Sequence, residues 1–168
     1  RGLSAVGPSA SVLANRTVLL DTTGVNVAGT LSGRDLALRG VDVPAAFPPD
    51  MSFGVIVTGG TMNVDRVSLG DVRGSALRCH ASERGPAELT VTGLRVSGLR
   101  ARDPTAVAPL EPTALELDGC EAEASGLQLS GPGVCAVRLV GNPSVSLDGA
   151  ACRYDVGLCL PSENPPPS

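Results

Sequence analysis

Short runs of alternating apolar and polar residues recur along the chain, and from residue 113 onward one pattern recurs at a nearly constant interval. One such pattern is found at TALELDG (113–119), CAVRLVG (135–141) and DVGLCLP (155–161). The spacing is 22 residues from Leu115 to Val137, and 21 from Val137 to Leu158. Alternation with a period of two is typical of β-strands, and a fixed repeat of this length is typical of stacked architectures. The pattern therefore predicts short β-strands wound into a coil that stacks on itself.

The same register can be extended toward the N-terminus. We predict that the leading strand of each turn contains one of six aligned residues: Val18, Val55, Leu77, Leu115, Val137 and Leu158. The successive intervals are 37, 22, 38, 22 and 21 residues. The two long intervals contain proline-rich insertions at 44–52 and 101–112, which a central strand would not tolerate. Two further alternating runs follow each leading strand, so we expect three short strands per turn and about six turns.

Glycine marks the corners between these runs. The segments VDRVSLGDVRG, VTGLRVSGLRA and ASGLQLSGPG each place glycine between two short alternating runs. In period and pattern, the chain resembles the right-handed parallel β-helix of the pectate-lyase-like superfold. This resemblance covers residues 17–160 and implies an all-β solenoid whose turns stack like residues on like. A β-sandwich of short strands is the alternative, but it does not explain a recurring three-strand unit.

This layout divides the chain into three parts. Residues 1–16 are expected to form an N-terminal cap or partial turn, and residues 17–160 the β-helix domain. Residues 161–168, PSENPPPS, contain four prolines and are expected to form a linker or tail.

The predicted register gathers charged residues on one outward face. Arg78, Glu116 and Arg138 fall in one outward column, and His80 and Asp118 fall in the next. Neighbouring turns of such a coil lie about 4.8 Å apart, so the five side chains are expected to lie close together. Both insertions enter just before this face, where they could wall a groove.

Two interpretations of this face are open. In the first, Arg78 and Arg138 bind the carboxylates of an acidic sugar, and His80, Glu116 and Asp118 are candidates for proton transfer. In the second, the charges form an alternating ladder on a solvated sheet, which only avoids contacts between like charges. The sequence motifs of polygalacturonases and pectate lyases are absent, which favours the second interpretation.

Composition excludes several classes of function. The formal net charge is −4, all 13 basic residues are arginine and they form no basic cluster, so we expect no nucleic-acid partner. No apolar run approaches the roughly 20 residues of a membrane helix, so we expect no membrane insertion. We find no phosphate loop or calcium nonapeptide, and we expect no cofactor and no metal.

The five cysteines lack CxxC spacing, which argues against a zinc site. Cys79 and Cys152 are expected to face inward as small core residues. Cys152 and Cys159 lie close together in sequence across one corner, and they are the first pair to test for a disulfide.

We therefore expect a non-catalytic structural or binding domain of a secreted or cell-envelope bacterial protein. It would present the polar face to a glycan or a protein, beside flanking domains of a longer chain. The alternative function is a carbohydrate-active enzyme, either a polysaccharide lyase or a glycoside hydrolase.

Overall fold

The computed structural model describes residues 2–7, 9–42, 53–83, 85–100, 112–130, 135–140, 144–148 and 151–153. These ranges contain strands and no helix. The first seven strands are β1 (Leu3–Ala5), β2 (Ser11–Leu20), β3 (Val25–Val27), β4 (Thr30–Asp42), β5 (Phe53–Thr58), β6 (Thr61–Arg73) and β7 (Ser75–His80). The other seven are β8 (Glu88–Ser97), β9 (Thr113–Asp118), β10 (Glu121–Ser125), β11 (Gln128–Ser130), β12 (Cys135–Val140), β13 (Ser144–Asp148) and β14 (Ala151–Arg153).

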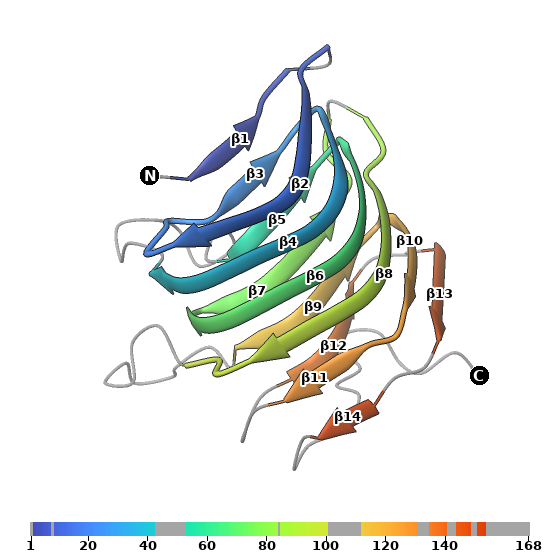
Figure 1. Ribbon diagram of the computed structural model, residues 1–168. Helices are drawn as coiled ribbons and strands as arrows, with labels where there is room; N and C mark the ends of the chain where they lie inside the picture. Colours follow the sequence, from blue (N-terminus) through green and yellow to red (C-terminus); the bar gives the residue numbers. More distant parts are fainter. Residues whose placement is uncertain are drawn as a thin grey trace, which may run out of the picture.

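The strands form two parallel sheets (Figure 1). Sheet A has the order β1-β3-β5-β7-β9-β12, and sheet B has the order β13-β10-β8-β6-β4-β2. Strand β11 pairs with β8 and β14 beside the main path of sheet B. From β1 to β10 the chain alternates between the sheets, so each strand of one sheet is the crossover between two neighbouring strands of the other. The all-β class with parallel sheets agrees with the sequence prediction.

The register of sheet A confirms the central part of the predicted stack. Val55 pairs with Leu77, Leu77 pairs with Leu115, and Leu115 pairs with Val137. All four side chains are at most 1% exposed. Leu158 and the predicted tail at 161–168 lie outside the described residues, as does the insertion at 44–52.

The first predicted turn is wrong. Val25, not Val18, pairs with Val55 in sheet A, whereas Val18 pairs with Ala37 in sheet B. The interval between the stacked residues is therefore 30 rather than 37. Apolar residues cluster around both Val18 and Val25, and the insertion that follows removes the constant spacing that would distinguish the two positions.

Sheet B bends along a column of residues in the left-handed conformation. These residues and their φ angles are Arg16 (50°), Asp35 (58°), Arg66 (61°), Gly93 (87°) and Gly126 (62°). The ladder is continuous on both sides of the bend, because Arg34 pairs with Asp65 before it and Leu36 with Val67 after it. The two runs expected after Val55 and after Leu77 are therefore halves of one bent strand, β6 and β8 respectively. The two runs expected after Val18, at Val25 and Leu36, instead lie in β3 and β4, in different sheets. They are separate strands after Leu115, as β10 and β11, and after Val137, as β13 and β14.

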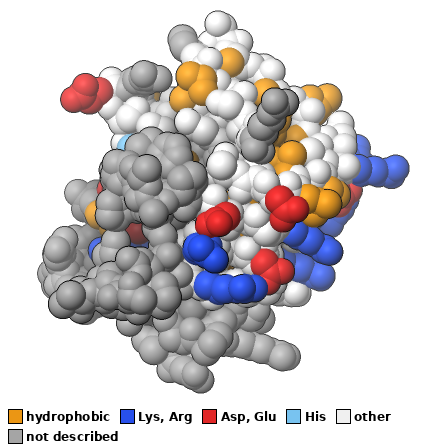
Figure 2. Space-filling model, turned by 90° about the vertical axis from the view of Figure 1, so that its left-hand side faces the viewer, with side chains coloured by type: hydrophobic (Ala, Val, Ile, Leu, Met, Phe, Trp, Pro, Cys, Tyr) orange, Lys and Arg blue, Asp and Glu red, His pale blue; other side chains and the backbone are white. Residues whose placement is uncertain are grey.

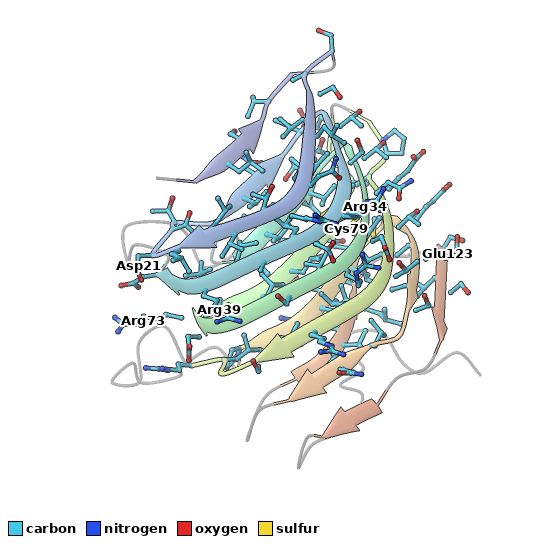
Figure 3. All side chains as sticks on the ribbon, in the orientation of Figure 1. Asp21, Arg34, Arg39, Arg73, Cys79 and Glu123 are labelled. Carbon is cyan, nitrogen blue, oxygen red and sulfur yellow. The ribbon has the colours of Figure 1, made fainter. Side chains whose placement is uncertain are left out.

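The buried apolar side chains of the described residues form one hydrophobic core between the sheets. Inward positions alternate with outward ones: Ala122 and Ala124 are buried, whereas Glu121 and Glu123 between and beside them are exposed. Figure 3 shows Cys79 in the interior and Glu123 on the outside of the molecule. Each strand therefore supplies one set of side chains to the core and one set to an outer face.

Replacing Gly126 with alanine is expected to lower the free energy of unfolding by about 1–2 kcal/mol, because a left-handed φ is unfavourable for a residue with a Cβ. The added Cβ would also lie 3.3 Å from the Cα of Gly93 on the neighbouring strand. Urea denaturation of Gly126→Ala and of the parent measures the difference.

Gly70→Ala is the matched control. At Gly70 the φ angle is not left-handed, and the nearest heavy atoms to an added Cβ are 3.9 Å away. Alanine at this position is expected to be neutral or stabilising, because it restricts the unfolded chain. Equal losses of stability in the two variants would contradict the assignment of the bend to backbone conformation.

Candidate functional site

The structure brings together all five charged residues that the sequence placed on one face. In sheet A, Arg78 of β7 pairs in register with Glu116 of β9, and Glu116 pairs with Arg138 of β12. His80 pairs with Asp118 one outward position further along the same strands. The five side chains form what we call the sheet A face. The second insertion, which was expected to wall this face, lies outside the described residues except for Pro112.

Arg78 is the centre of the sheet A face. Its Nε lies 3.0 Å from Oε1 of Glu116, and its Nη2 donates a hydrogen bond of 3.2 Å to Oδ2 of Asp118. The same guanidinium lies over the ring of Phe53, with its Cζ 5.5 Å from the ring centroid. Nη1 of Arg138 lies 3.7 Å from the other oxygen of Glu116. Two arginines thus hold the two carboxylates in fixed positions.

The expectation of a solvated charge ladder is wrong for the middle of this face. The side chains of Glu116 and Arg78 are only 9% and 14% exposed, whereas Arg138 is 43% exposed. A buried carboxylate needs a charged partner, because the protein interior solvates charge poorly. Glu116 and Arg78 therefore form a largely desolvated ion pair, and only the outer arginine resembles the expected ladder.

Exposed ion pairs elsewhere provide a contrast. Figure 2 shows acidic and basic side chains side by side on the surface that faces left in Figure 1. Two exposed ion pairs lie at the C-terminal ends of the sheet B strands. They join Arg73 to Asp42 at 3.6 Å and Arg100 to Asp71 at 3.2 Å. Such solvated pairs contribute little to stability. Burial thus distinguishes the Arg78 cluster from the rest of the charged surface.

Burial raises the pKa of Glu116 above its ordinary value. Arg78 and Arg138 oppose this rise by attraction, and the Asp118 carboxylate adds to it by repulsion. Asp118 is itself 32% exposed and bonded to Arg78. Burial of Glu116 therefore outweighs the attraction of its two arginine partners.

The raised pKa predicts a pH-dependent difference between the parent and Glu116→Gln. A carboxyl whose pKa is higher in the folded state stabilises the fold below its unfolded pKa, taken as 4.5, and loses that contribution as the pH rises through the folded value. The stability of Glu116→Gln relative to the parent should therefore increase as the pH rises from 4 to neutrality. Urea denaturation at several pH values measures this trend, and the opposite trend would show that ionisation of Glu116 stabilises the fold.

The geometry allows binding more readily than proton transfer. Both carboxylates are held by Arg78, and Glu116 is also held by Arg138. His80 lies in the outer column, in register with Asp118. In the described ranges, no group of three or more His, Cys, Asp or Glu side chains could hold a metal ion. The charged groups of this face are therefore held in position by ion pairs with one another.

The sequence analysis missed a pair of thiols behind this face. Cys79 is fully buried, as expected, and Cys120 is 1% exposed. Both are free thiols, and a hydrogen bond to Cys120 together with burial raises the pKa of the Cys79 thiol. The predicted register contained a signal for this thiol pair. Leu117 is the partner of Cys79 on the neighbouring strand, and Cys120 lies only three residues after Leu117. The pair expected from sequence, Cys152 with Cys159, falls outside the described side chains.

The fold and the site define an all-β protein with parallel sheets and a compensated charged face. Comparisons with family models, with curated proteins and with solved structures find no match to the chain. Among the described residues, no helix is long and apolar enough to cross a membrane.

Proposed function

We propose that the chain is a right-handed parallel β-helix domain that acts as a non-catalytic structural and binding scaffold. The register supports this architecture, since successive strands of each sheet pair in parallel from β3 to β9 and from β2 to β10. Parallel strands joined by a crossover are right-handed in nearly all proteins. Stacking of like on like gives such a scaffold its rigidity.

One observation carries the non-catalytic assignment: Arg78 holds Glu116 and Asp118 together in a largely desolvated cluster. A general acid or base must be free to exchange a proton with a substrate, and a catalytic nucleophile must be free to attack. Carboxylates fixed by arginines instead form a preorganised surface of donors and acceptors. Such a surface suits recognition, because little side-chain entropy is lost on binding.

The proposed ligand of the sheet A face is a glycan or a protein. The charges of the arginines and the carboxylates compensate one another, so the face offers directional hydrogen bonds rather than a strong electrostatic field. We place the domain in a secreted or cell-envelope protein of a bacterium, where β-helix scaffolds that display glycan-binding surfaces are expected. Flanking domains of a longer chain would supply further partners.

The alternative is a carbohydrate-active enzyme, and the raised pKa of Glu116 favours it. A carboxyl whose pKa is raised above its ordinary value is a better general acid for glycosidic cleavage than an unperturbed one. In that mechanism His80 and Asp118, in the next outward column, would be candidates for the base.

Binding and depolymerisation assays on a panel of acidic and neutral polysaccharides test both functions. The parent is compared with His80→Ala, Arg138→Ala and Arg39→Ala, the last being an exposed arginine of sheet B that serves as the control. The scaffold function predicts binding without chain cleavage, weakened by Arg138→Ala and unchanged by Arg39→Ala. Cleavage that is lost in His80→Ala would instead establish the enzyme. Absence of both binding and cleavage would overturn both functions and leave a spacer.

A further inference from the structure

The bend of sheet B forms a groove on the outer surface of sheet B, separate from the sheet A face. The groove has a volume of about 650 Å³ and runs across the strands from β2 to β11. Its polar lining consists of Arg16, Asp35, Arg66, Ser68, Arg95 and Gln128. None of these residues belongs to the sheet A face, so the groove is a separate surface.

The groove follows from the left-handed column. At this column the strand changes direction within one residue, so the outer surfaces of its two halves meet at an angle. At one end of the column the positions are Gly93 and Gly126, which carry no side chain. Ala37 and Ser68 are the small outward residues beside it. Small side chains at these positions leave the floor of the groove open.

Among the described side chains, only one of the three groove arginines, Arg66, forms an ion pair. Arg66 forms a two-pronged ion pair with Asp35, with distances of 2.6 and 3.1 Å, and it also contacts Asp65 at 2.7 Å. This pairing holds the pKa of Asp35 below its ordinary value. Among the described side chains, no carboxylate lies within 4.0 Å of Arg16 or Arg95. The groove therefore carries surplus positive charge in a protein whose net charge is −4.

The neighbours of Arg95 add neutral hydrogen-bonding groups. In the outward column that contains Arg95, Ser68 precedes it on β6 and Gln128 follows it on β11. A hydroxyl, a guanidinium and an amide are thus presented in successive turns, about 4.8 Å apart. A linear polysaccharide lying along this direction meets a new polar group at nearly every sugar unit, because a hexose advances the polymer by a similar distance.

We propose that this groove binds a linear acidic polysaccharide laid across the strands, with its anionic groups on Arg16 and Arg95 and its hydroxyls on Ser68 and Gln128. Arginine binds carboxylate and sulfate groups through two parallel hydrogen bonds, which gives the contact direction as well as charge. An acidic peptide fits less well. The strand backbones at the groove are already paired on both sides within sheet B, so a peptide could not add a strand there. Its amide groups would lose water without gaining backbone partners.

Isothermal titration calorimetry with alginate oligomers of increasing length tests the proposal. The parent is expected to bind alginate with an affinity that rises with chain length and falls with salt. Arg95→Gln and Arg16→Gln should each weaken binding about tenfold, as expected for loss of a charge-assisted hydrogen bond. Arg73→Gln, an exposed arginine outside the groove, should leave the affinity unchanged. Thermal unfolding of each variant confirms that the fold is retained.

Three results would overturn the groove assignment. The first is equal binding of the parent and Arg95→Gln, and the second is equal binding of uncharged dextran. The third is tighter binding of polyglutamate that the same two variants abolish, since it would make the groove a peptide site. Alginate binding that is lost in Arg138→Ala but retained in Arg95→Gln would move the ligand to the sheet A face. That result would support the proposed function while rejecting the groove.

Discussion

Replacing Leu115 with alanine is expected to lower the free energy of unfolding by about 2–5 kcal/mol. Leu115 is fully buried and lies in register between Leu77 on one side and Val137 on the other. In a stack of parallel strands each turn covers its neighbours, so a cavity at Leu115 removes packing from the turns above and below it. Urea denaturation monitored by circular dichroism measures the loss.

Leu13→Ala is the matched control for this prediction. Leu13 is the same residue type in a strand of sheet B, but it is 70% exposed. Its replacement should change the free energy of unfolding by no more than about 0.5 kcal/mol. If Leu115→Ala is as stable as Leu13→Ala, the stacked core is not what holds the two sheets together.

The position of Leu115 could be predicted from the sequence because the turn that follows it, to Val137, contains no insertion and keeps the 22-residue spacing. Where two turns follow one another without an insertion, a spacing of 22 residues identifies the stacked positions Val55 with Leu77, and Leu115 with Val137. The same reasoning failed at Val18. When an insertion lies between two turns, the spacing between them no longer tests the alignment, so a wrong register goes undetected. Alternation by itself does not distinguish a strand of one sheet from a strand of the other.

The bend of sheet B shows a second limit of the pattern. Gly93 and Gly126 mark the corner in the sequence, but in the turns before them the same corner is occupied by Arg16, Asp35 and Arg66. Arginine carries no signal for a left-handed conformation, and aspartate carries only a weak one. Periodicity therefore found the runs on each side of the corner but not the column that joins them, nor the groove that the column creates.

The members of the sheet A face could be predicted, but their burial could not. Register places Glu116 between Arg78 and Arg138, and the structure confirms these neighbours. The alternating pattern describes only which way a side chain points. It contains no information about how far an outward side chain is removed from water, and that depth separates a desolvated ion pair from a surface ladder.

Replacing Arg78 with alanine is expected to lower the free energy of unfolding by about 3–5 kcal/mol at neutral pH. The substitution leaves Glu116, whose side chain is 9% exposed, with Arg138 at 3.7 Å as its remaining ion-pair partner in the described part of the face. The cost comes from a buried carboxylate that has lost its closer charged partner, so it should shrink at low pH as Glu116 becomes protonated. Denaturation of the variant and the parent at pH 7 and pH 4 measures both effects.

Two further variants separate charge from packing. Arg138→Ala should cost less than about 1 kcal/mol, because the Arg138 side chain is 43% exposed and its charge is screened by water. The double variant Arg78→Met, Glu116→Gln removes both buried charges while keeping similar volume, and it should recover much of the stability lost in Arg78→Ala. An equal loss in the single and double variants at every pH would mean that Arg78 contributes through its packing on Phe53 rather than through its charge.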